Sequence, residues 1–348
     1  MVQSNWNILY IGSMDVKSNS YMRCKTIEQL GYTVMPLNPD PYILNSVFTK
    51  LQYHFSIGPG VLRLNRKICS LLQQQAFDVV LVDNKSYLLS STLKYIRKKY
   101  PAATICNILT DDPFGRYRKS WGLTRKTAAF FDIHFVQRRQ NKAELLAAGA
   151  RQVEFCFRSF DPSFHRPVEL STGDKIKYGT AVGFVGSYEE HREAAVAQLI
   201  QQGIPVAVTG NDWQKGKYWN IIQSFYKGPS VYGEAYIKTI NGMDIALHFL
   251  RRGNRDEQDS RSFEIPACRV FMLAEHSYLH ELFFEEDKEA VFFNNSDELA
   301  GKINYYLQHP AQRQAIAAAG YQRCLSSGYS HQERLREVFK IIAAHKAQ

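Results

Sequence analysis

The feature that most constrains the fold is a short pattern near the start of the chain, which predicts a strand, a glycine turn, a helix and a strand. The apolar run Asn7 to Ile11 ends at Gly12 and Ser13. Helical spacing over residues 21–30 then leads to a second apolar run at 33–37. Such a βαβ unit crosses over with a right hand and binds ligands at the carboxyl ends of its strands. Gly12 is either a simple turn or a place where backbone approaches a phosphate or a sugar.

The same pattern begins again in the second half of the chain. Residues 181–185 form an apolar run that ends at Gly186 and Ser187, and helical spacing over 191–201 leads to a further run at 204–208. Two such openings predict two similar α/β domains, each with a mainly parallel sheet.

The length supports this division, because 348 residues are many for one hydrophobic core. A polar, proline-containing segment from Phe160 to about residue 174 is the candidate linker. We therefore predict a first domain over residues 1–170, a second over 171–330, and a final helix over 331–348.

Two adjacent acids follow the predicted strand 104–109 in the first domain. Asp111 and Asp112 stand just before Pro113, where α/β enzymes keep catalytic groups. One of them could act as a general base on an acceptor hydroxyl. Alternatively, either side chain could simply cap a helix.

Arginines cluster in the second domain, after the apolar run that begins at Ile245. Arg251, Arg252 and Arg261 would be unfavourable to bury without an anion. Asp256 and Glu264 flank them, with seven residues between the two carboxylates. The pattern indicates a site for a phosphorylated ligand at the carboxyl edge of this sheet.

Other candidates for this ligand site follow the preceding strands. Gly186 and Ser187, ahead of the helix that contains Arg192, could offer backbone N–H groups to a diphosphate. Gly210 and Trp213 follow the next run, where Trp213 could stack on a nucleobase or simply pack in the core.

Composition limits the class of protein further. The net charge of +10 favours anionic partners, such as a nucleoside diphosphate, anionic lipid or nucleic acid, but the basic residues are dispersed and match no nucleic-acid-binding motif. The six cysteines form no CxxC pair and no zinc-site pattern, and they indicate reduced thiols in a cytoplasmic protein. No apolar run approaches the ~20 residues that cross a bilayer, and the N-terminus does not resemble a signal peptide.

Two segments have open interpretations. Residues 39–59 are aromatic and predicted to be irregular; they either pack or form a lid or an acceptor-facing surface. The predicted helix 88–99 ends in basic residues, which either complement the helix dipole or attract a membrane surface.

Six motifs in this order resemble the CgeB-like glycosyltransferases of the spore-maturation-protein type. They are IGS near the start, TDDPF at 110–114, FDPSFHRP at 160–167, FVGS at 184–187, RSFEIPAC at 261–268 and KINYYLQHP at 302–310. The resemblance covers most of the chain. It implies a bacterial protein with the GT-B fold: two Rossmann-like α/β domains facing each other across a cleft, and a last helix that packs back on the first domain.

The resemblance also implies an activity and a mechanism. The expected enzyme is a hexosyltransferase-like glycosyltransferase that moves a sugar from a nucleotide-activated donor in the second domain to an acceptor hydroxyl in the first, with retention. Glu264 would hold the ribose. Asp256 is shorter than the glutamate usual there, and Arg269 replaces a common glycine.

No Asp-x-Asp motif stands at a predicted strand end, so neither a metal nor another cofactor is expected besides the co-substrate. The acceptor could be a glycan, a lipid-linked glycan or a protein, at the inner face of a membrane or elsewhere in the cytoplasm. A nucleotide-sugar epimerase or hydrolase, or a non-catalytic nucleotide-sugar-binding protein, could use the same fold.

Overall fold

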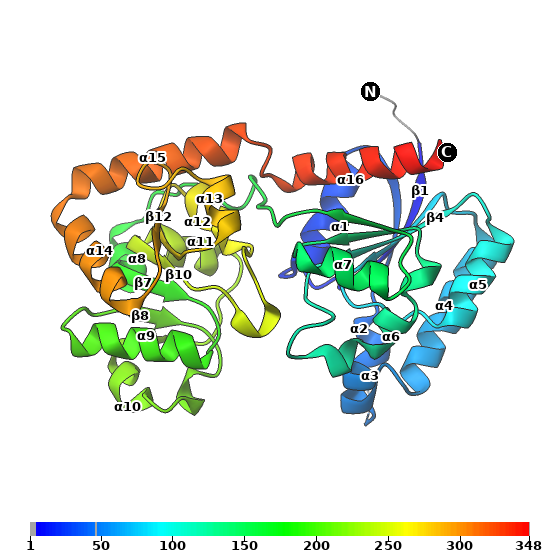
Figure 1. Cartoon of the computed structure of the whole chain (residues 1–348), viewed down its shortest axis with the longest axis horizontal. Helices are drawn as coiled ribbons and strands as arrows, with labels where there is room; N and C mark the ends of the chain where they lie inside the picture. Colours follow the sequence, from blue (N-terminus) through cyan, green and yellow to red (C-terminus); the bar gives the residue numbers. More distant parts are fainter. Residues whose placement is uncertain (1–4, 46, 348) are drawn as a thin grey trace. The chain divides into compact units, whose positions relative to one another are not determined.

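The protein, seen in a computed structural model that describes residues 5–45 and 47–347, consists of two compact units (Figure 1). The first unit contains the chain up to Phe157, residues 252–255, and residues from His331 onward. The second contains residues 158–251 and 256–330. The chain thus leaves the first unit at Phe157, earlier than residue 170. Across the described ranges, no helix combines the length and the apolar character needed to cross a membrane.

The first unit is built on a six-stranded parallel sheet with the order β2-β1-β3-β4-β5-β6. Its strands are β1 (Asn7–Ile11), β2 (Thr33–Leu37), β3 (Val79–Asp83), β4 (Thr104–Leu109), β5 (Ile133–Val136) and β6 (Gln152–Phe155). Its helices are α1 (Asn19–Gln29), α2 (Asp40–Ile43), α3 (Thr49–Phe55), α4 (Pro59–Gln74), α5 (Ser90–Lys99), α6 (Gly122–Lys126), α7 (Gln140–Ala147) and α16 (His331–Lys346), with 3₁₀ turns η1 (Arg118–Trp121), η2 (Ala128–Phe130) and η5 (Arg252–Asn254).

Both faces of this sheet are covered, as a parallel sheet requires. In β1, Leu9 and Ile11 face a core made with α4 and α5, while Ile8 and Tyr10 face a core made with α1 and α16. This alternation follows from the two-residue period of a strand. Because its apolar side chains Leu335 and Val338 complete the second core, α16 belongs to the first unit although it ends the chain.

The second unit has a six-stranded parallel sheet with the order β12-β11-β10-β7-β8-β9. Its strands are β7 (Thr180–Val185), β8 (Ala207–Thr209), β9 (Tyr226–Gly228), β10 (Met243–His248), β11 (Phe271–Glu275) and β12 (Val291–Phe293). Its helices are α8 (Thr172–Tyr178), α9 (Glu190–Gln201), α10 (Trp219–Ile222), α11 (Glu234–Asn241), α12 (Arg261–Ala267), α13 (Tyr278–Phe283), α14 (Ser296–Gln308) and α15 (Pro310–Ser326), with 3₁₀ turns η3 (Trp213–Lys215) and η4 (Gln223–Phe225).

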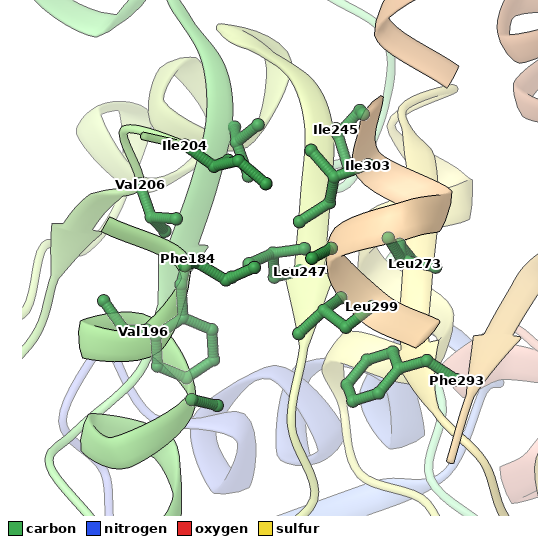
Figure 2. Close-up of a cluster of buried hydrophobic side chains, with 14 of the residues drawn as sticks. Phe184, Val196, Ile204, Val206, Ile245, Leu247, Leu273, Phe293, Leu299 and Ile303 are labelled. Carbon is green, nitrogen blue, oxygen red and sulfur yellow. The ribbon is translucent and has the colours of Figure 1, made fainter. Parts of the chain in front are cut away.

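The main core of the second unit lies between this sheet and the helices α9 and α14. Figure 2 shows Phe184 and Leu247 from the strands meeting Val196 of α9 and Leu299 of α14. All four side chains are at most 1% exposed. Burying each contributes roughly 1.5–3 kcal/mol relative to exposure, so this core holds the strand ends of the site in place.

Two local expectations differ from the structure. The strand expected over 204–208 begins only at Ala207, because Pro205 has no backbone N–H to give to a sheet ladder. The segment 39–59 is not irregular: it contains α2 and α3. Both helices are short, so they leave no long periodic pattern in the sequence.

Candidate functional site

The strand order of the second unit places its candidate site. From β7 the chain moves to β8 and β9 on one side and returns to β10 on the other. The carboxyl ends of β7 and β10 therefore form the switch point of the sheet, where open α/β sheets bind ligands. Gly186 and Ser187 follow β7 there, and Arg251 follows β10.

The buried side chain of Arg192 in α9 forms hydrogen bonds with the segments that follow β7 and β10. Its Nη1 donates to the Ser187 carbonyl at 3.1 Å and its Nη2 to the Phe249 carbonyl at 3.0 Å. The residue is 3% exposed, and Nε has no partner among the described residues. Burial, and after it the nearby Arg261, lowers the pKa of Arg192 to about 10. Arg192 thus supports the loop from behind and adds positive potential to it.

Two further guanidinium groups reach the same edge of the sheet. Arg251 pairs with Glu189 through Nε at 3.2 Å, and Arg261 donates from Nε to the Val185 carbonyl at 2.7 Å. Arg261 also lies 3.3 Å from Asp259. Burial alone would raise the pKa of Asp259, but His248 and Arg261 hold it well below its usual range. Three arginines therefore gather at the switch point, with Glu189 and Asp259 as their acidic partners.

The loop after β7 offers one backbone donor rather than two. The Gly186 N–H already donates to the Thr209 carbonyl at 2.9 Å, so the expected contact from Gly186 to a diphosphate is replaced by a sheet hydrogen bond. Ser187 is exposed, and within the described part of the chain no partner for its N–H is found. Of the two expected backbone donors, the Ser187 N–H is therefore the one that the sheet does not engage.

Trp213 and Gly210 both lie against the Gly186 carbonyl in this loop. Trp213 is fully buried and its Nε1 donates to the Gly186 carbonyl at 2.9 Å, so of the two interpretations that the sequence left open, the structure shows packing in the core. Gly210 has φ of +157°, and a Cβ there would lie 1.9 Å from the Gly186 carbonyl oxygen. Only glycine permits that approach.

Glu264 in α12 is a buried carboxylate with two partners. Tyr236 of α11 donates its hydroxyl to Oε2, and Nε2 of His165 lies 3.4 Å from Oε1. Nδ1 of His165 accepts from the Asp161 N–H at 3.0 Å, so the proton of a neutral ring is on Nε2 and points to Glu264. His165, from the FDPSFHRP motif, is 3% exposed. Burial, and after it Glu264, raises the pKa of Tyr236 well above its usual value.

Asp256 and Arg252, the other two candidates from this segment, belong to different units. Asp256 is half-buried in the second unit, with its N–H donating to the Arg251 carbonyl at 3.2 Å. Arg252 is exposed and begins η5, which belongs to the first unit. The neighbouring residues Arg251 and Arg252 therefore belong to separate units.

A buried network that the sequence did not reveal supports α12. His280 Nδ1 faces the Glu275 carbonyl at 2.8 Å, so it carries the proton, and Nε2 accepts from the Ser262 hydroxyl at 2.8 Å. His248 Nε2 meets Asp259 at 3.0 Å. His248, Ser262 and His280 are all at most 1% exposed, so this Ser-His-Asp grouping positions the start of α12 and is not open to a substrate. Burial lowers the pKa of His280 to about 3.

The switch point of the first unit lies between β1 and β3. A Cβ on Gly12 would lie 2.4 Å from the Ser20 hydroxyl, so the turn after β1 requires glycine for packing. Ser13 is half-buried and its hydroxyl donates to Asp40 at 2.5 Å. Asn84, just after β3, donates from Nδ2 to Asp111 at 2.9 Å and accepts the Asp111 N–H at 3.1 Å.

Asp112 is engaged by an arginine that sequence reasoning passed over. Arg255 donates from Nε to Oδ2 at 2.5 Å and from Nη2 to Oδ1 at 2.9 Å, and it also pairs with Glu144 at 2.8 Å. The Phe114 N–H and the Asn141 side chain donate to Oδ1 as well. Although burial acts to raise it, these donors lower the pKa of Asp112.

Asp112 is therefore a poor general base. A base needs a pKa near the working pH and an accessible lone pair, and the Asp112 side chain is 0% exposed. Asp111 is the more accessible of the two acids, since it is half-buried and held by Asn84 and by Asn254 at 3.2 Å. Different partners hold the two carboxylates, as expected for adjacent residues after a strand.

Comparison with known proteins agrees with this fold. Residues 191–340 match the family model described as glycosyl transferase-like. The curated protein Spore protein CgeB of Bacillus subtilis is 24% identical over 168 residues, which cover 43% of this chain and 50% of that protein. The match thus spans about half the length of the curated relative.

Solved structures match over nearly the whole chain. Sucrose-phosphate synthase of Thermosynechococcus elongatus has a TM-score of 0.71 at 10% identity, covering 97% of this chain and 99% of that one. The HepE protein of Anabaena in complex with UDP-glucose has a TM-score of 0.66 at 12% identity, covering 97% and 100%.

The two Rossmann-like units have the GT-B fold, as predicted. The family match over residues 191–340, which is less than half of the chain, agrees with this fold. Its likeness to CgeB is a partial one, confined to less than half of the chain.

Proposed function

We propose that this protein transfers a sugar from a nucleoside diphosphate donor, bound at the carboxyl edge of the second unit's sheet, to an acceptor hydroxyl. One observation carries the proposal: Arg192, Arg251 and Arg261 gather at the switch point between β7 and β10. Negative charge grows on the leaving diphosphate as the glycosidic bond breaks, and preorganised positive groups stabilise that charge.

The roles of these arginines differ with their exposure. Arg251 has a side chain that is 44% exposed, so it can turn from Glu189 to a phosphate oxygen. Arg261, at 26%, and buried Arg192 act through their fixed charge. With three cations supplied by the chain, we propose that transfer needs neither a divalent metal nor another cofactor.

Glu264 is proposed to bind the ribose. Its Oε1 lies 3.4 Å from Nε2 of His165, and a carboxylate oxygen can accept more than one donor. A ribose hydroxyl could therefore bind Oε1 while Tyr236 still donates to Oε2. Asp111, the more accessible acid of the first unit, is proposed to orient the acceptor hydroxyl.

We further propose a retaining reaction in the synthesis of a cell-surface glycan or glycoconjugate. The acceptor would be a glycan, a lipid-linked glycan or a protein. Peripheral contact with the inner face of a membrane would bring the enzyme to a lipid-linked acceptor. The partial likeness to CgeB and the likeness in fold to sucrose-phosphate synthase support this proposal.

Thermal shift with UDP, GDP, ADP, dTDP and CMP, each with Mg²⁺ or EDTA, tests the donor site. UDP is the first choice because HepE is described with UDP-glucose. A ligand at 100 times its dissociation constant should stabilise the fold by about 2.7 kcal/mol, equally with Mg²⁺ and with EDTA. If no nucleoside diphosphate stabilises the protein, the proposed donor site is wrong.

A pair of variants sharpens this test. Arg251→Gln should weaken the binding of the nucleoside diphosphate about tenfold or more, the loss of one charged hydrogen bond. The matched control is Arg323→Gln, whose side chain is similarly exposed at 36% and also lies near one glutamate, Glu289. Equal affinity in both variants would contradict the role of Arg251.

Product analysis separates transfer from its alternatives. NMR of the product with a UDP-sugar donor should show the anomeric configuration of the donor retained. Release of free sugar without an acceptor would indicate a hydrolase, a changed sugar stereocentre an epimerase, and nucleotide binding without turnover a binding protein.

A further inference from the structure

The first unit carries an exposed apolar surface that its fold does not use. Seventeen large hydrophobic side chains are well exposed among the described residues, and eight of them fall between residues 44 and 62. They are Leu44, Val47, Phe48, Leu51, Tyr53, Phe55, Ile57 and Leu62. Clustered apolar exposure of this kind marks an interaction site, whereas scattered single residues do not. We call these eight residues the α3 surface.

Helix α3 turns one polar side chain, Gln52, inward, while its Lys50 and His54 are exposed. Gln52 is 0% exposed, and its side chain donates to the Ile43 carbonyl at 3.0 Å and accepts the Gly60 N–H at 2.5 Å. On the same helix, Tyr53 and Phe55 are 48% and 54% exposed. A helix on a protein surface in water normally has the opposite arrangement. These hydrogen bonds fix α3 so that its apolar side chains point away from the core.

The charged side chains of the segment that carries this surface are all positive. The sequence contains no Asp or Glu between Asp40 and Asp78. On α4, Arg63, Arg66 and Lys67 are exposed on the face that also carries Leu62, because residues four apart lie on one side of a helix. Within the described ranges, none of these three side chains forms an ion pair.

Neighbouring segments extend the same chemistry. Helix α3 packs against η1, where Arg118 and Lys119 are exposed beside Tyr117, which is 51% exposed. In Figure 1, α3 lies at the end of the first unit that is away from α16. The apolar and basic side chains thus share one end of this unit.

We propose that the α3 surface docks the protein on the surface of an anionic phospholipid bilayer. Aromatic and aliphatic side chains that flank basic ones are the arrangement by which helices lie in a membrane interface, with apolar groups at the headgroup and acyl boundary. Arg63, Arg66 and Lys67 contact the lipid phosphates. The complete lack of acidic side chains over residues 41–77 favours a negatively charged bilayer over a protein or a neutral glycan.

Sedimentation of the full chain with vesicles tests the proposal without nucleotide or sugar transfer, so it succeeds or fails independently of the proposed function. The vesicles contain phosphatidylcholine alone, or phosphatidylcholine with a quarter phosphatidylglycerol. The chain should bind the anionic vesicles at low salt, bind neutral vesicles far more weakly, and be released as salt rises. Failure to bind anionic vesicles at low salt would overturn the proposal.

Two variants separate the charged and apolar contributions. Arg63→Gln, Arg66→Gln and Lys67→Gln combined should weaken binding by about fivefold per residue, about a hundredfold in all. The control for charge is Lys175→Gln, Lys177→Gln and Lys227→Gln combined, three exposed lysines of the second unit. The fold loss of vesicle binding in this control should be less than a third of the loss in the Arg63, Arg66 and Lys67 variant. An equal loss would show that only net charge matters and would refute the proposed surface.

The apolar variant is Phe55→Ser with Ile57→Ser, at side chains that are 54% and 63% exposed. It should lose most vesicle binding while its thermal unfolding midpoint stays near that of the parent, because neither side chain is in a core. The control, Leu282→Ser with Leu325→Ser, changes side chains that are 56% and 51% exposed in the second unit. If Phe55→Ser with Ile57→Ser instead converts a dimer to a monomer without affecting vesicle binding, the surface joins two copies of the chain.

Discussion

The contact between Arg255 and Asp112 makes a prediction whose size and sign can both be derived. Arg255→Met keeps much of the side-chain volume but removes four charged hydrogen bonds, two to Asp112 and two to Glu144. Breaking a buried ion pair by removing one partner typically costs 3–5 kcal/mol. Because Arg255 is 33% exposed, we expect the lower end, about 3 kcal/mol at pH 7.

The pH dependence gives this prediction its sign. In the parent, the pKa of Asp112 is lowered by folding, so its contribution is present above the unfolded pKa near 4 and is lost as pH falls below it. Without Arg255, burial becomes the main influence and raises the pKa of Asp112. The buried carboxylate is then destabilising above pH 4, so the cost of Arg255→Met should shrink as the pH falls from 7 towards 3.5.

Urea unfolding at pH 7, 5 and 3.5 measures these differences. Adding Asp112→Asn to Arg255→Met should recover much of the loss at pH 7 and remove its pH dependence. Arg323→Met, which removes a partly exposed contact of 3.6 Å to Glu289 and one hydrogen bond of 2.9 Å to the Phe283 carbonyl, should cost less, about 1 kcal/mol. If Arg255→Met costs as little as Arg323→Met, or if its cost is the same at all three pH values, the reasoning is wrong.

Two further predictions concern the second unit. Between pH 7 and pH 5 its stability should fall by about 2 kcal/mol through His280, whose folded pKa of about 3 lies below the unfolded value near 6.5, so that protons bind the unfolded state. This fall should be absent in His280→Gln. If the urea midpoint of His280→Gln still falls between pH 7 and pH 5 as it does in the parent, the prediction is wrong. Trp213→Phe removes the 2.9 Å hydrogen bond to the buried Gly186 carbonyl and should cost about 1–3 kcal/mol, whereas an unchanged midpoint would show that this carbonyl finds another donor.

The sequence predicted the frame of the fold well. The strands at 7–11, 33–37 and 104–109 were placed to the residue, because each is a compact apolar run ended by a glycine or a polar group. The GT-B architecture, expected from motif resemblance, is confirmed by the structural matches, and the glycosyltransferase activity expected with it is supported by the family match over residues 191–340. Helix α3 was missed, because its exposed aromatic residues do not follow a core-facing period.

For the candidate site, the sequence found residues but not their orientations. Arg251, Arg261 and Ser187 were named, and they lie at one strand edge of the second unit. Trp213 was considered for a nucleobase, but it points into the core. Asp112 was named for its place after a strand. Nothing in the local sequence shows that Arg255 pairs with its carboxylate.

What the sequence determined by itself is local: continuous apolar runs specify strands buried on both faces, glycines specify tight turns, and the repeat of this pattern specifies two α/β units. What the tertiary structure decided depends on partners far apart along the chain. Asp112 meets Arg255 from 143 positions away, and Arg192 meets the Phe249 carbonyl from 57 positions away. Periodicity reflects which face of an element is buried, whereas the ionisation and availability of a side chain depend on neighbours that only folding brings together.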